Sequence, residues 1–107
     1  MLGLIEEKQA ALEALCQRYG VQRLDLFGSA ARDDFDPDRS DLDFIVEFGP
    51  LPPGERGRAF FGLLLALEDL FERRVDLVTL ASVQNPYFLQ EIAASRKMIY
   101  AAESAAV

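Results

Sequence analysis

The sequence predicts a small domain of the α/β (α+β) class, with a mixed sheet of three to four strands flanked by helices. With 107 residues the chain can enclose one core, so we expect a single domain over residues 1–107. Half of the residues are hydrophobic, which favours a packed core over disorder. Segments with helical periodicity alternate with short β-branched runs, the pattern of a sheet covered by helices.

The first half of the chain is predicted to form a helix, a strand and a short helical turn. Apolar residues at helical spacing, with Gly20 in the position of a helix-ending glycine, predict a helix over residues 3–19. Residues 21–27 form a short β-type run. One or two helical turns are expected over residues 29–34, followed by a turn-rich loop around Pro37.

The second half repeats this alternation. Ile45 and Val46 lie at the centre of a strand expected over residues 42–48, and a connection rich in Gly and Pro follows it. Residues 55–72 have a broad apolar face at helical spacing. The remaining predicted elements are a strand over 75–80, a helix over 82–95 and a strand over 98–101.

Composition excludes several classes of function. The net charge of −7 argues against nucleic acid as the main partner, because phosphate backbones require a surplus of Lys and Arg. The chain has no histidine, which rules out a Ser-His-Asp triad and the usual zinc sites. Cys16 is the only cysteine, so we expect no intrachain disulfide, a reducing compartment and a packing role on a helix face. Without a signal peptide or a membrane-length apolar run, a soluble cytoplasmic protein is expected.

Aspartates are concentrated in one segment and form three Asp-x-Asp pairs. Seven of the nine aspartates lie between residues 25 and 43, so some pairs are expected by chance. The pairs Asp34/Asp36 and Asp36/Asp38 are best interpreted as a solvated turn. Asp41/Asp43 differs, because the apolar run that follows predicts a strand in which alternate side chains share one face.

Two carboxylates placed side by side repel each other. At ~4–5 Å and an effective dielectric constant near 20, this repulsion costs roughly 3–4 kcal/mol, so one carboxylate must be protonated or a cation supplied. Ligation by oxygen alone points to Mg²⁺ or Mn²⁺. The alternative is that Asp41 and Asp43 are two solvated carboxylates, or that one of them pairs with Arg39.

Two further positions add to this site. Glycine at Gly28 lets the backbone approach a ligand, and a helix that begins at Ser29 would direct N–H groups toward phosphate. Asp76 is the one acid in an apolar strand, where burial without a partner would be expensive. Metal ligation would offset that cost, and so would a salt bridge to Arg73 or Arg74.

Together these residues resemble the polymerase β-like nucleotidyltransferase superfamily. The resemblance rests on Gly28-Ser29, Arg32, Ser40-Asp41-Leu42-Asp43 and Asp76, and it covers nearly the whole chain. Within the superfamily the chain is similar to the minimal nucleotidyltransferases (MNT), the MntA-type antitoxins that accompany HEPN-domain toxins. One departure is Asp33, where the family usually has glycine after Ala-Arg.

The resemblance implies a two-metal transfer of AMP from ATP. It assigns Asp41, Asp43 and Asp76 to catalysis and to binding two ions, Mg²⁺ or Mn²⁺. The positions that it assigns to nucleotide binding are Gly28, Ser29, Arg32 and Ser40. From its residues alone, Arg32 could equally pair with a neighbouring aspartate at the surface.

The resemblance also implies the acceptor, a tyrosine hydroxyl of a HEPN RNase toxin that AMP addition silences, and an assembly with that toxin. Two alternatives stay open: a non-catalytic antitoxin that masks its partner, and transfer to a small molecule such as an aminoglycoside. The apolar face around Phe60, Phe61 and Leu64 is expected to be core, or in part an interface.

Overall fold

The computed structural model describes residues 2–28, 41–79 and 82–102, and it confirms the α/β class. Within these residues one mixed sheet has the strand order β3-β2-β1-β4. Its strands are β1 (Val21–Phe27), β2 (Leu42–Phe48), β3 (Val75–Thr79) and β4 (Lys97–Ala101). β1 is antiparallel to β2 and to β4, whereas β2 and β3 are parallel. The predicted turns at 29–34 and the last residue of the predicted strand 75–80 lie outside the described residues.

The helices are α1 (Leu2–Glu7), α2 (Gln9–Arg18), α3 (Glu55–Phe71) and α4 (Pro86–Ser95). The prediction of one continuous helix over 3–19 was wrong, because the chain turns at Lys8, whose amide donates to the Ile5 carbonyl at 3.1 Å. No Gly or Pro marks this break, so it reflects tertiary packing rather than local propensity.

The last helix also begins later than the predicted residue 82. The Asn85 side chain accepts hydrogen bonds from the amides of Tyr87 at 2.9 Å and Phe88 at 3.4 Å, and Pro86 occupies the first turn. An Asn cap followed by Pro is a strong helix start, because it satisfies free amides and supplies a ring already set to helical φ. The cap therefore fixes the first residue of α4.

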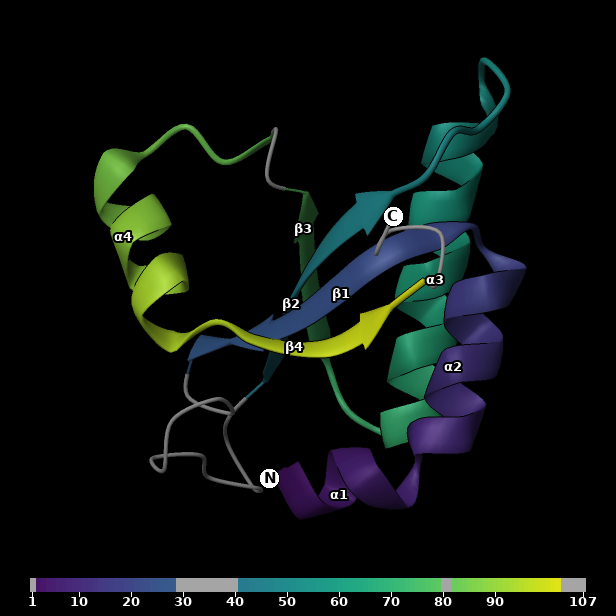
Figure 1. Cartoon of the computed structure of the whole chain (residues 1–107), viewed down its shortest axis with the longest axis horizontal. Helices are drawn as coiled ribbons and strands as arrows, with labels where there is room; N and C mark the ends of the chain where they lie inside the picture. Colours follow the sequence, from purple (N-terminus) through teal and green to yellow (C-terminus); the bar gives the residue numbers. More distant parts are fainter. Residues whose placement is uncertain (1, 29–40, 80–81, 103–107) are drawn as a thin grey trace.

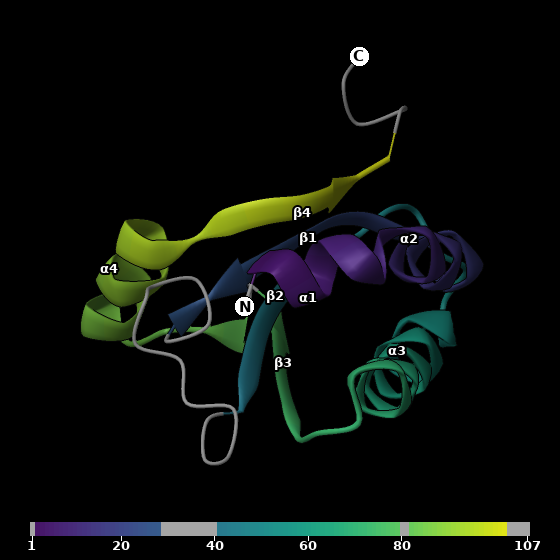
Figure 2. The same ribbon diagram turned by 90° about the horizontal axis from the view of Figure 1, so that it is seen from below.

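Helices cover the sheet from two sides (Figures 1 and 2). The main core lies between the sheet and α1, α2 and α3, and it contains Leu24, Phe44, Leu67 and the buried Cys16. On the other side, α4 packs through Ile92 against the outer side chains of β1 and β2. The sheet therefore has two covered faces, and among the described helices α4 is the one that covers the second.

The residues expected in the core differ in how deeply they are buried. Cys16 is buried in the main core, where burial raises the pKa of its thiol to about 12, so it packs as a small apolar residue. Phe60 and Leu64 pack against the core as expected, whereas Phe61 is 63% exposed. In the described part of the chain, no helix is long and apolar enough to cross a bilayer.

A buried ion cluster fastens the end of α4 to the sheet. Asp25 of β1 is completely buried, and its carboxylate accepts from the Nε atoms of Arg23, at 2.9 Å, and of Arg96. Arg96 directly follows α4, and its Nη2 atom also lies 3.6 Å from Oε2 of Glu47 in β2. Because both oxygens of Asp25 have charged donors, the cluster satisfies a carboxylate that would otherwise be costly inside the protein.

Removal of the Asp25 carboxylate should destabilise the fold strongly. We expect Asp25→Ala to lower the free energy of unfolding by about 2–3 kcal/mol, since it leaves two guanidinium groups without their buried partner. Urea unfolding measures this loss. As a control, Glu47→Ala removes an exposed partner of Arg96 and should cost less than about 1 kcal/mol. Equal stability of Asp25→Ala and the unmodified chain would contradict a stabilising role for the cluster.

Candidate functional site

The parallel register of β2 and β3 sets two aspartates side by side. Asp43 of β2 is the direct partner of Asp76 of β3, and across the other edge of β2 it faces Phe27, the last residue of β1. Asp43 is half-buried and Asp76 is exposed. Asp41 lies one residue before β2 and is also half-buried. The structure thus pairs Asp43 with Asp76, and Asp41 lies near enough to add its negative charge at Asp43.

The electrostatic effect of this arrangement is concentrated on Asp43. Burial, a hydrogen bond to Asp76 and the negative charges of Asp76, Asp41 and Glu91 raise the pKa of Asp43 from 3.8 to about 7. Near neutral pH Asp43 therefore keeps its proton in a large part of the molecules, because a second negative charge beside Asp76 is unfavourable. The same repulsion makes the pair attractive to a cation.

The sequence argument about Asp76 has to be corrected. Asp76 was expected to suffer from burial in an apolar strand, but its side chain is exposed while Val75 and Leu77 on either side are buried. The penalty of burial falls on Asp43 instead. The alternative considered for Asp76, an acid in an apolar strand neutralised by arginine, describes Asp25.

Gly28 lies directly against the Asp43 carboxylate. Its φ is +72°, and a Cβ atom at this position would lie 2.4 Å from Oδ2 of Asp43. A side chain here is therefore disfavoured both by the backbone conformation and by the contact with Asp43. The Gly28 amide donates to the Ser95 hydroxyl at 3.0 Å. That amide is therefore already bonded, and what Gly28 supplies to the site is space beside Asp43. Ser29, Arg32 and Ser40, the other predicted nucleotide-binding residues, lie outside the described residues.

The described carboxylates fit a hard divalent cation in part. Asp43 and Asp76 offer oxygen ligands of the kind that Mg²⁺ prefers, and a cation would replace the proton held by Asp43. Over residues 2–28, 41–79 and 82–102, no three acidic or cysteine side chains gather closely enough to enclose an ion. This suits Mg²⁺, which protein sites commonly hold by one or two carboxylates together with substrate phosphates.

Sequence reasoning missed two residues near the site, Glu91 and Ser95. Both belong to α4, and Glu91 contributes to the negative field at Asp43. Neither has a local signal, because a glutamate or serine within a helix is common. Only the packing of α4 against β1 brings them to this end of the sheet.

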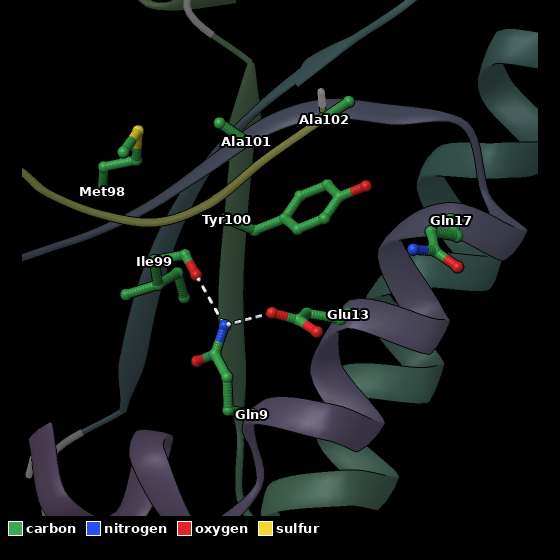
Figure 3. A pocket seen from close by; sticks show the side chains of 8 residues that line it. All are labelled: Gln9, Glu13, Gln17, Met98, Ile99, Tyr100, Ala101 and Ala102. Atoms are coloured by element: carbon green, nitrogen blue, oxygen red, sulfur yellow. Dashed lines mark hydrogen bonds between the residues drawn. The ribbon is translucent and has the colours of Figure 1, made fainter. Parts of the chain in front are cut away.

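A groove away from Asp43 and Asp76 does not offer the same chemistry. It has a volume of about 720 Å³ and lies between α2 and β4 (Figure 3). Gln9 spans it, donating from its Nε2 atom to the Ile99 carbonyl at 3.1 Å and to Glu13 at 3.3 Å. Its lining contains one carboxylate and none of the predicted site residues, so Asp43 and Asp76 remain the candidate functional site.

Removing the charge of Asp43 should stabilise the metal-free protein. We expect Asp43→Asn to raise the free energy of unfolding at pH 8 by on the order of 1–2 kcal/mol, a value reduced for the partial exposure of the site. Because the folded state holds a proton here that the unfolded state releases above pH 3.8, stability falls as the pH rises from about 3.8 to about 7 and levels off above that value.

Thermal unfolding in EDTA at pH 5 and pH 8 measures this effect. The advantage of Asp43→Asn should widen from pH 5 to pH 8, whereas Asp69→Asn, at an exposed position of α3, should show no such trend. An advantage that is the same at both pH values would contradict the raised pKa of Asp43.

Substitution of Gly28 should damage the site more than the fold. We expect Gly28→Ala to lose about 1–2 kcal/mol of stability through positive φ and to displace the Asp43 carboxylate. Gly57→Ala is the matched control, since a Cβ there meets nothing within 4 Å in helix α3, and it should be stabilising. Mn²⁺ binding followed by calorimetry should be weakened only by Gly28→Ala; unchanged binding would refute the contact.

Comparison with known proteins shows the family to which the chain belongs. The family model described as "Nucleotidyltransferase domain" matches residues 8–99. A protein of Methanocaldococcus jannaschii, provisionally named a protein adenylyltransferase, is 35% identical over 82 residues, which cover 73% of this chain and 76% of the relative.

Solved structures share the fold. One, provisionally named a minimal nucleotidyltransferase, has a TM-score of 0.71 and is 31% identical to this chain. The match covers 90% of this chain and 93% of that one. A toxin–antitoxin structure with AMP-PNP has a TM-score of 0.65 at 22% identity, covering 90% of this chain and 75% of that one. A complex of a tri-AMPylated Shewanella oneidensis HEPN toxin with MNT antitoxin has a TM-score of 0.61 at 20% identity, and the match covers 92% of this chain and 74% of that one. The chain therefore belongs to the nucleotidyltransferase domain family, as a nucleotidyltransferase of the minimal (MNT) type.

Proposed function

We propose that this nucleotidyltransferase uses Mg²⁺ to transfer AMP from ATP to a tyrosine hydroxyl of a partner HEPN toxin, and so acts as an antitoxin. The observation that carries the proposal is the pairing of Asp43 with Asp76 in the β2–β3 register, together with the raised pKa of Asp43, in a chain of the nucleotidyltransferase family. Two similar structures support the finer points: one contains AMP-PNP and the other an AMPylated HEPN toxin.

In this proposal the three aspartates divide the work. Asp43 and Asp41 hold the cation and position the triphosphate, and Asp43 gives up its proton when the cation binds. Asp76 is exposed, so it can face the incoming acceptor hydroxyl and help to remove its proton. A bound Mg²⁺ ion supplies charge stabilisation to the phosphate oxygens. The hydroxyl attacks the α-phosphorus, an O–P bond forms, and pyrophosphate leaves.

The remaining assignments are proposals from the resemblance. Ser29, Arg32 and Ser40 are proposed to bind the phosphates of ATP, and Gly28 leaves room beside Asp43. Asp76 would also help to hold a second metal ion, which would make the acceptor hydroxyl easier to deprotonate.

Two other functions make different predictions. A masking antitoxin would neutralise its partner by contact alone and would not need the carboxylates. Transfer to a small molecule such as an aminoglycoside would use the same carboxylates on another acceptor. The Asp43–Asp76 pair favours transfer over masking, because masking by contact alone has no need for an acid whose burial raises its pKa beside a second acid.

Adenylyl transfer can be tested directly. The chain is incubated with Mg-ATP and the protein encoded beside it, and the products are examined by mass spectrometry. We expect AMP on a tyrosine of the partner, and a loss of at least about 100-fold in rate for Asp41→Asn/Asp43→Asn, because the metal contributes several kcal/mol to the transition state. EDTA should abolish the transfer.

The control and the alternative outcomes separate the three functions. Asp69→Asn, which changes one exposed carboxylate far along α3, should transfer AMP at the normal rate. Neutralisation of the partner by Asp41→Asn/Asp43→Asn, with no transfer by the unmodified chain, would establish masking instead. Labelling of an aminoglycoside but not of the protein would establish the small-molecule function.

A further inference from the structure

The last turn of α4 is attached to the end of β1 at three points. Ile92 packs against Phe27, Arg96 pairs with Asp25, and the Ser95 hydroxyl accepts the Gly28 amide at 3.0 Å. The first two contacts hold the helix on the sheet. The third reaches the residue that touches the Asp43 carboxylate.

The hydroxyl of Ser95 has a fixed orientation. It donates its hydrogen to the Glu91 carbonyl at 3.0 Å, so a lone pair is left to accept the Gly28 N–H. A serine that merely satisfied itself within a helix would need only the bond one turn back. The bond to Gly28 instead crosses 67 residues of sequence and is buried.

Gly28 passes this constraint on to Asp43. A Cβ added to Gly28 would lie 2.4 Å from Oδ2 and 3.3 Å from Cγ of Asp43, so the glycine backbone is in close contact with the carboxylate. Close-packed atoms transmit small displacements because there is no empty space to absorb them. The position of the Gly28 amide therefore limits where the Asp43 oxygens can lie.

We propose that Ser95 is a positioning residue: its hydroxyl holds Gly28, and through Gly28 it sets the place of the Asp43 carboxylate that binds the cation. This inference rests on the proposed function, in which Asp43 is a metal ligand. Groups that support a ligand without touching the metal commonly change its affinity by 10–100-fold when removed. Ser95 extends the functional site onto α4.

Mn²⁺ binding to the full chain, measured by electron paramagnetic resonance without nucleotide, tests this role. Ser95→Ala should weaken Mn²⁺ binding by about tenfold. Ile92→Val is the matched control, since it loosens the same helix on the same strand without touching Gly28, and it should change affinity less than about twofold. Ser95→Thr keeps the hydroxyl and should restore most of the affinity.

The outcomes are distinguishable. If the unmodified chain does not bind Mn²⁺, the metal site of the proposed function fails, and the positioning role fails with it. If the unmodified chain binds and Ser95→Ala binds equally well, only the positioning role is refuted. Equal losses in Ser95→Ala and Ile92→Val, or an equally weak Ser95→Thr, would also refute it, because they assign the effect to helix packing.

Discussion

The repulsion between the carboxylates of Asp43 and Asp76 is the constraint around which the described part of this structure is organised. The pair exists because β2 and β3 run parallel in a register that places the two residues directly opposite each other. Gly28 is a glycine because any side chain would occupy the space of the Asp43 carboxylate. α4 then holds Gly28 in place through Ser95.

Such a site works against the stability of the fold that carries it. Asp43 is half-buried, and its pKa of about 7 records how unfavourable its charge is there. Stabilisation comes from elsewhere: from the apolar core under α2 and α3, and from the buried Asp25 cluster under the end of α4. This separation allows a charged site at the sheet edge while the rest of the domain stays well packed.

Local patterns in the sequence predicted strands better than they predicted the surroundings of the site. The first two strands were predicted with the bounds that β1 and β2 have, because each is a short β-type run that ends at a glycine. The break at Lys8 was not predictable, since no residue there disfavours a helix. Asp25 and Asp76 each lie in a strand-forming segment of the sequence. Only the direction in which each side chain leaves its strand, and what packs over that face, decide that Asp25 is buried and Asp76 exposed. Glu91 and Ser95 reach the site through contacts distant in sequence, which no local period encodes.

The central claim is that Asp43 and Asp76 form a site for a divalent cation. The most direct test is a titration of the Asp43 side-chain carbon by ¹³C nuclear magnetic resonance, with and without Mg²⁺. Without Mg²⁺ the account predicts a midpoint near pH 7, and with saturating Mg²⁺ a midpoint moved well toward acid, because the cation replaces the proton of Asp43. A midpoint near 3.8 without metal, or one that Mg²⁺ leaves unchanged, would contradict the claim.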